Sequence, residues 1–156
     1  MIQISLWVTG KTNFDFIKEG IVLYQKRLKH YCHFSIMELQ ESRGQDSKEV
    51  YKKMEGDILL SKLKPGDRLV LLDEKGKNLD SIQFAAFIEQ QMVHANKQLI
   101  FIIGGAYGFS SKVYERANYS VSLSPMTFSH QIVRLLFMEQ LYRAMTIIKG
   151  EPYHNV

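Results

Sequence analysis

Three runs rich in aliphatic and aromatic residues, separated by segments with helical spacing, restrict the fold of this chain more than any other feature. They read IQISLWVT at residues 2–9, RLVLL at residues 68–72 and LIFII at residues 99–103. A strand without polar side chains must be covered on both faces, which is typical of parallel sheets. Helical periodicity occupies residues 15–29, 47–63, 81–95 and 110–117, and the stretch after residue 123. We therefore predict an α/β fold with a mainly parallel sheet and helices on both faces.

The chain has 156 residues, which is long enough for one domain with a real core, so we expect residues 1–156 to form a single domain. Two further strands are expected at residues 33–39 and 119–123. The segment DEKGKNLD, at residues 73–80, is expected to be a turn.

Composition excludes some classes of function and favours others. The formal net charge of +4 favours an anionic partner, with nucleic acid as the leading candidate. Cys32 is the single cysteine, so we expect no internal disulfide, no cysteine-based zinc site and no metal. No apolar run approaches the ~20 residues that span a bilayer, and the N-terminus lacks the pattern of a signal peptide. We therefore expect no membrane contact and a cytoplasmic location.

Residues 8–12, VTGKT, share their last three residues with a P-loop. That motif also needs a glycine five residues before its Gly-Lys pair, and this chain has Ser5 there, inside the first predicted strand. We therefore reject a nucleoside triphosphatase.

Three loops follow predicted strand ends: the first after Leu72, the second at Gly104 in GGAYG, and the third at residues 123–128, LSPMTF. If the three strands are neighbours, the loops converge on one pocket, because ligands in open α/β sheets bind beyond the carboxyl ends of strands. Adjacent glycines let a ligand approach the backbone, although a tight strand-to-helix turn would also need them. Small residues and apolar side chains such as Met126 and Phe128 suit an adenine-and-sulfonium ligand better than a triphosphate.

The stretch LSPMTFSHQIVRLLFMEQLYRAM, at residues 123–145, is apolar on nearly every side but carries four polar residues that need an explanation. His130 and Arg134 lie one helical turn apart, and Glu139 and Arg143 share a different face. His130 could instead form local hydrogen bonds at a helix start, and Glu139 and Arg143 could form an ion pair. A helix that is apolar all round is either central or packed on a partner chain. A homodimer meets that requirement and would bring polar residues of one subunit to the pocket of the other.

The segments LDEKGK, FIIGGAYGFS, LSPMTFSHQIVRLLFMEQLYRA and GEPYH occur in this order along the chain. Together they resemble the ribosomal RNA large subunit methyltransferase H family of the SPOUT class, over essentially the whole length. The chain departs from the family pattern at Ser129, where the family often has proline. It also departs after His154, where Asn155 and Val156 stand in place of a further histidine or lysine.

This resemblance implies a SPOUT fold whose C-terminal part forms a deep trefoil knot, a homodimer, and S-adenosyl-L-methionine bound at the knot. The implied reaction is methylation of N3 of a pseudouridine in helix 69 of 23S ribosomal RNA, within the assembled 70S ribosome. The cofactor contacts of the family fall on these residues of the chain: Leu72, Gly104, Leu123, Ser124, Pro125, Met126, Thr127 and Phe128.

The proton on N3 must leave during this reaction, so a base or a group that stabilises an anion is expected beside the acceptor. His130, Tyr153 and His154 are candidates for that role, and solvent is another destination for the proton. Arg134 and Arg143 are candidates for holding phosphate or the developing anion. The alternative function is a ribosome- or RNA-binding module without catalysis, and cofactor binding separates the two.

Overall fold

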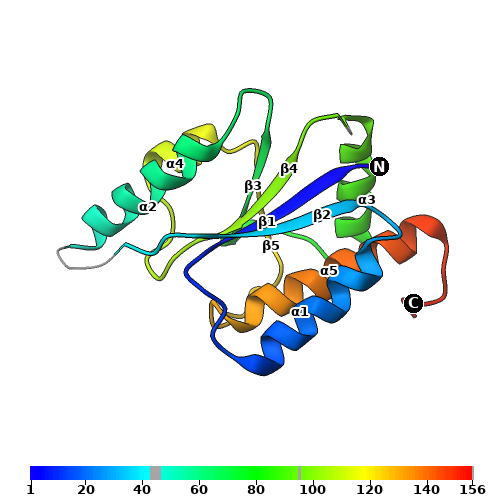
Figure 1. The fold of residues 1–156 in the computed structure, drawn as a ribbon. Helices are drawn as coiled ribbons and strands as arrows, with labels where there is room; N and C mark the ends of the chain where they lie inside the picture. Colours follow the sequence, from blue (N-terminus) through cyan, green and yellow to red (C-terminus); the bar gives the residue numbers. More distant parts are fainter. Residues whose placement is uncertain (43–46, 95, 156) are drawn as a thin grey trace.

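The computed structural model of the chain describes residues 1–42, 47–94 and 96–155. Its strands form one sheet in the order β2-β1-β4-β3-β5, and every pair of neighbours is parallel (Figure 1). The strands are β1 (Gln3–Thr9), β2 (His33–Leu39), β3 (Arg68–Asn78), β4 (Leu99–Ile103) and β5 (Tyr119–Ser122). The predicted parallel sheet is confirmed. Ala95, the predicted end of a helix, and Val156, one of the tail departures, lie outside the described residues.

Helices cover both faces of the sheet, as predicted. They are α1 (Asp15–Leu28), α2 (Lys48–Lys62), α3 (Ser81–Gln91), α4 (Ser111–Arg116) and α5 (Ile132–Lys149), with a short 3₁₀ helix η1 (Met92–His94) after α3. The sheet has a hydrophobic core on each face. Residues of α1, α3 and α5 contribute to one core, and residues of α2 and α4 contribute to the other (Figure 1). Alternate strand side chains divide between the two: Phe101 belongs to the first core, whereas Leu71 and Ile102 belong to the second.

Capping side chains explain several helix starts. The hydroxyl of Ser47 accepts a hydrogen bond from the backbone N–H of Val50 at 3.3 Å, so Ser47 caps α2. Asp80 and Gln83 form a reciprocal capping box at the start of α3. Such caps satisfy backbone donors that the first turn of a helix leaves open.

The predicted end of the third strand at Leu72 is wrong, because β3 continues to Asn78. Both Leu72 and Lys77 pair with Val121, so residues 73–76 leave the sheet and the chain then returns to the same place on β5. Where the chain returns, Gly76 lies so close to β5 that a Cβ on this residue would be 2.7 Å from the backbone of that strand. The turn predicted at residues 73–80 is therefore a short excursion within a strand.

The third helix was predicted to reach residue 95, but α3 ends at Gln91 and η1 follows. Arg68, at the start of β3, explains the difference. Its guanidinium donates hydrogen bonds to the carbonyl oxygens of Gln91 at 2.9 Å, His94 at 2.9 Å and Lys97 at 3.1 Å. The guanidinium of Arg68 thus provides hydrogen-bond donors for carbonyl groups at and after the end of α3. A continuing α-helix would not present these carbonyl groups to one side chain.

The final helix, α5, packs between α1 and α3 on one face of the sheet (Figure 1). Its apolar residues on the sheet side, including Phe137, Met138 and Leu141, are fully buried. The helix is therefore central within a single chain, so its apolar character by itself does not require a partner chain. Among the described helices, none has the length and apolar character needed to cross a membrane.

Candidate functional site

A cavity of about 240 Å³ lies at the carboxyl ends of β4, β3 and β5, which are neighbours in the sheet. The three loops named from the sequence converge on it. Of the residues expected to contact the cofactor, seven line this first cavity: Leu72, Gly104, Leu123, Ser124, Met126, Thr127 and Phe128. Pro125 belongs to the same loop but is not among the lining residues.

Local hydrogen bonds give the loop after β5 a defined shape. The hydroxyl of Ser122 donates to the carbonyl oxygen of Ser124 at 2.8 Å, and the hydroxyl of Ser124 accepts from the N–H of Met126 at 2.9 Å. The hydroxyl of Thr127 donates to Glu74 at 2.8 Å, which ties this loop to the β3 excursion. At Ser129 the hydroxyl accepts from the N–H of Ile132 at 3.2 Å, so serine has a local role at the start of α5.

The first cavity combines apolar walls with two carboxylates, Asp73 and Glu74. No lysine or arginine is present among the described residues that line it. Tyr114 donates a hydrogen bond to Asp73, and burial together with this bond raises the pKa of Tyr114 to about 12. A cavity of this composition suits a ligand with a flat apolar part and positive charge, whereas a triphosphate would need cations.

Arg134 is buried inside the chain, with 1% of its surface exposed. Its guanidinium donates to the carbonyl oxygens of Thr9 at 2.9 Å, Gly10 at 3.1 Å and His130 at 3.1 Å. It also donates to the hydroxyl of Thr12 at 2.9 Å, and burial lowers the pKa of Arg134. The guanidinium of Arg134 thus joins the end of β1 to the start of α5, and its predicted contact with phosphate or the developing anion stays a prediction.

Arg143, Tyr153 and His154 form a network with Glu139 near the C-terminal end of α5. Arg143 pairs with Glu139 at 2.8 Å, which confirms the ion pair considered from the sequence, and its guanidinium lies 4.8 Å from the centre of the Tyr153 ring. Arg143 also donates to Nδ1 of His154 at 3.1 Å, since a guanidinium cannot accept. Tyr153 donates to Glu139 at 2.8 Å.

The geometry of this network bears on which group can act as a base. Burial, followed by the hydrogen bond to Glu139, raises the pKa of Tyr153 above its ordinary value, so its phenolate is disfavoured. The Nδ1 atom of His154 faces the guanidinium of Arg143 at 3.1 Å and is therefore occupied within this network. Neither side chain is therefore arranged as a base in the single chain.

The sequence-predicted catalytic residues fall into two separate groups. Of the five, only His130 lines the first cavity. Arg143 follows Arg134 by nine residues along α5, which corresponds to roughly 13 Å of helix. The structure therefore does not bring the network of Arg143, Tyr153 and His154 to the cavity of its own chain.

The sequence of this chain is similar to those of known proteins. A family model described as a predicted SPOUT methyltransferase matches residues 2–154. The chain belongs to the SPOUT methyltransferase family. Proteins named ribosomal RNA large subunit methyltransferase H are similar over nearly their full lengths. The protein of that name from Cytophaga hutchinsonii is 49% identical, covering 99% of this chain and 100% of its own. Those from Parabacteroides distasonis and Bacteroides fragilis are 47% and 46% identical, each covering 99% of both chains.

The resemblance to this family of SPOUT methyltransferases is thus confirmed, but reasoning from the sequence did not single out the two carboxylates of the cavity. Asp73 and Glu74 were assigned to a turn, although an acidic pair directly after a buried strand end was a usable signal. Within the described part of the chain, no cluster of three or more histidine, cysteine, aspartate or glutamate side chains is placed to hold a metal ion.

Proposed function

We propose that this SPOUT methyltransferase transfers a methyl group from S-adenosyl-L-methionine to N3 of a pseudouridine in helix 69 of 23S ribosomal RNA, within the assembled 70S ribosome. The names of its relatives and the net charge of +4 support an RNA substrate. The observation that carries the proposal is the convergence of three loops on the first cavity at the ends of β4, β3 and β5.

The first cavity is the proposed site of S-adenosyl-L-methionine. When bound, this molecule supplies an electrophilic methyl group on a positively charged sulfonium. Leu72, Met126 and Phe128 offer apolar contacts, and the backbone at Gly104 is open to close approach. The carboxylates of Asp73 and Glu74 suit the positive charge of the sulfonium and the amino group. Leu123, Ser124 and Thr127 belong to the lining, whereas Pro125 shapes the same loop from outside it.

Further parts of the proposal follow from family membership. We propose that residues 1–156 are a single domain whose C-terminal part forms a deep trefoil knot around the first cavity. We also propose a homodimer, because the network of Arg143, Tyr153 and His154 lies away from the cavity of its own chain. A partner chain could bring that network to the cavity. Assembled ribosomes place the site of action in the cytoplasm.

The enzyme's main contribution to methyl transfer is positioning, because the acceptor nitrogen must approach the methyl group in line with the leaving sulfur. The proton on N3 leaves to His130, the candidate at the cavity, or to solvent. Arg134 orients this part of the site by holding the carbonyl group of His130. Arg143 and His154 would contact the RNA or stabilise the developing anion.

The first test combines cofactor binding with methyl transfer. A Cβ at Gly104 would already lie 3.0 Å from the ring of Phe109, so the larger side chain in Gly104→Val must displace this ring, which lines the cavity. We expect calorimetry to show at least a hundredfold loss of affinity for S-adenosyl-L-methionine, or about 2.7 kcal/mol. Circular dichroism should remain native. Normal affinity in the folded variant would exclude the first cavity as the cofactor site.

The same preparation separates the enzyme from a passive RNA-binding module. Purified protein, S-adenosyl-L-methionine with a labelled methyl group, and ribosomes lacking this modification should yield one methyl group per 23S ribosomal RNA. Mass spectrometry of nuclease fragments should place it on N3 of a pseudouridine in helix 69. A passive module would bind ribosomes without transferring label and would not bind the cofactor.

A further inference from the structure

A second cavity, of about 1350 Å³, opens on the other side of the carboxyl end of β4. The two cavities share the following lining residues: Ile103, Gly104, Gly105, Ala106 and His130. A methyl donor and its acceptor react at a separation of roughly 3–3.5 Å, so the acceptor must occupy space adjoining the cofactor. A third cavity beside Gly104 has only about 20 Å³, which is too small for a nucleobase.

The topology of the sheet explains both large cavities. β4 leads to α4 on one face, whereas its neighbours β1 and β3 lead to α1 and α3 on the other. Where adjacent strands send their chains to opposite faces, the loops separate and leave a crevice, the usual ligand position in such folds. The first cavity lies between the ends of β4 and β3, and the second adjoins the ends of β4 and β1.

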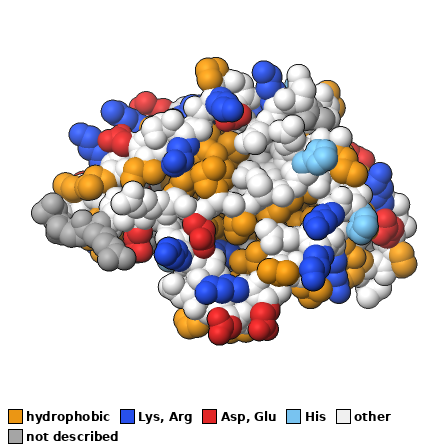
Figure 2. All heavy atoms as spheres, viewed as in Figure 1, with side chains coloured by type: hydrophobic (Ala, Val, Ile, Leu, Met, Phe, Trp, Pro, Cys, Tyr) orange, Lys and Arg blue, Asp and Glu red, His pale blue; other side chains and the backbone are white. Residues whose placement is uncertain are grey.

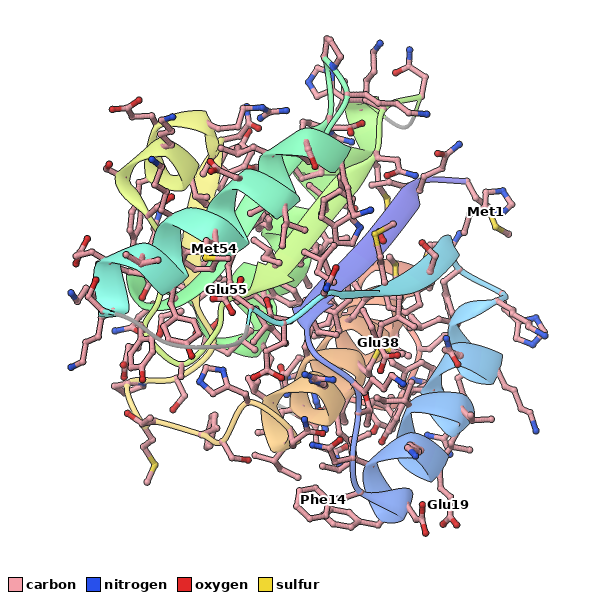
Figure 3. All side chains as sticks on the ribbon, turned by 60° about the vertical axis from the view of Figure 1, so that its left-hand side comes forward. Met1, Phe14, Glu19, Glu38, Met54 and Glu55 are labelled. Carbon is pink, nitrogen blue, oxygen red and sulfur yellow. The ribbon has the colours of Figure 1, made fainter. Side chains whose placement is uncertain are left out.

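Of the three described carboxyl groups that line the second cavity, Glu38, Glu41 and Glu55, the first and last have different surroundings. Glu38, at the end of β2, is engaged within the chain because it accepts a hydrogen bond from the N–H of Thr12 at 2.7 Å. Glu55 extends from α2 and is half-buried against the shared wall (Figure 3). A Cβ on Gly105 would collide with its carboxylate, so the glycine permits this close approach.

We propose that the second cavity receives the base of the acceptor nucleoside, and that Glu55 accepts a hydrogen bond from one of its N–H groups. This inference rests on the proposed function and deepens it by naming a residue that binds the acceptor. An ionised carboxylate is purely an acceptor, and pseudouridine has N–H groups at both N1 and N3. The rings of Tyr51 and Tyr107, with centres 5.6 Å apart in the same cavity, offer surfaces on which a base can stack.

Burial, followed by the charge of Glu41, raises the pKa of Glu55. The folded chain therefore holds the carboxyl proton of Glu55 more tightly than the unfolded chain does. This difference stabilises the fold at low pH, and the stabilisation is lost as pH rises through the raised pKa. A carboxyl group that weakens the fold at neutral pH, in the second cavity and against Gly105 of the wall shared with the first, is typical of a functional position. The other charged and titratable groups lining cavities with Glu55 are Lys11, Glu38, Glu41, Tyr51, Lys52, Tyr107, His130 and Arg134.

The test compares Glu55→Gln with Glu115→Gln, an exposed control on α4, which covers the same face of the sheet. We expect Glu55→Gln to lower kcat/KM for ribosome methylation at least tenfold, with affinity for S-adenosyl-L-methionine unchanged within twofold. The melting temperature at neutral pH should equal or exceed that of the unmodified protein, because the buried charge is gone. The control should match the unmodified protein in all three measurements.

A pH profile provides a readout that a purely structural role would not change. In the unmodified protein, kcat/KM should fall on the acid side as the carboxyl group gains its proton. In Glu55→Gln that part of the decrease should be absent, although His130 is retained in both proteins. An unchanged kcat/KM in Glu55→Gln, or an identical acid limb, would overturn the inference while the proposed function stands. If the unmodified protein neither binds the cofactor nor transfers methyl groups, both proposals fail.

Discussion

Arg134 shows how one buried side chain can organise a site through hydrogen bonds within its own chain. Its guanidinium satisfies the carbonyl groups of Thr9 and Gly10 after β1 and that of His130 before α5. The first two lie beside the second cavity, and His130 lines both cavities. The charge is compensated mainly by backbone dipoles, with the nearest oxygen of Glu38 at 4.0 Å. Arg134 thus fixes the distance between two segments: the end of β1, which lines the second cavity, and the start of α5, where His130 lines both cavities.

Replacing this residue with methionine tests that role. Arg134→Met preserves much of the side-chain volume but leaves several buried carbonyl groups without a donor, so we expect the free energy of unfolding to fall by about 3 kcal/mol. Urea denaturation would measure the change. The matched control is Lys26→Met, an exposed cation on α1, which should shift the value by less than about 0.5 kcal/mol. Equal stabilities for the two variants would contradict the positioning role.

At the scale of elements, β3 joins the sheet to the first cavity. The strand pairs with β5, leaves at Asp73, and resumes pairing at Lys77. During the excursion it places Asp73 and Glu74 in the cavity wall, where Glu74 is bonded to Thr127. The backbone at Gly76 then passes so close to β5 that no side chain fits. The position of both carboxylates therefore depends on one glycine.

Gly76→Ala should disturb this element. The added Cβ would meet the backbone of Ser120 and Val121 at 2.7 Å, and backbone cannot yield as a flexible side chain can. We expect a loss of about 1–3 kcal/mol in the free energy of unfolding, together with weaker binding of S-adenosyl-L-methionine. Lys75→Ala, at an exposed neighbouring position, is the control and should retain both properties. Native stability and affinity in Gly76→Ala would show that the excursion can move without affecting the cavity.

At the scale of the whole molecule, exposed apolar side chains on and beside α1 point to a further contact. Phe14, Phe16, Val22 and Leu23 are each about half exposed, with Phe16 reaching 60%. Figure 2 shows apolar side chains among charged ones on the surface, and Figure 3 shows Phe14 at the start of α1. Because α1 packs beside α5, a second copy bound there would also lie near the network of Arg143. This surface supports the proposed homodimer on grounds other than the apolar character of α5.

Sedimentation at micromolar concentration should therefore show a dimer. The double variant Phe16→Glu and Leu23→Glu should shift the protein toward a monomer, because it places charges in a contact that excludes water. Both positions are already exposed in the single chain, so the far-ultraviolet circular dichroism should stay native. A monomer for the unmodified protein at this concentration would contradict the proposed assembly. A dimer that persists in the double variant would place the interface elsewhere.

The sequence by itself determined the parallel sheet and the loops that leave it after β4 and β5, but not the end of β3. The run LIFII has no polar side chain to present to water, so β4 had to be buried on both faces. Serine at position 47 favours a helix start, because its hydroxyl accepts a hydrogen bond from a backbone N–H group that the first turn leaves without a partner. Convergence of the loops after Leu72, Gly104 and Ser122 depended on the order of the strands, which local patterns do not specify.

Tertiary structure alone decided what β3, α5 and Arg134 do. Residues 73–78 have the composition of a turn, and only pairing with β5 makes the last part a strand. An apolar helix can be covered by its own chain or by another, and the neighbouring positions of α1 and α3 settle most of that choice for α5. Arg134 resembles a ligand for phosphate until three carbonyl groups from distant segments surround it. Each outcome depends on contacts between residues far apart in the chain, and these form only when the whole fold is assembled.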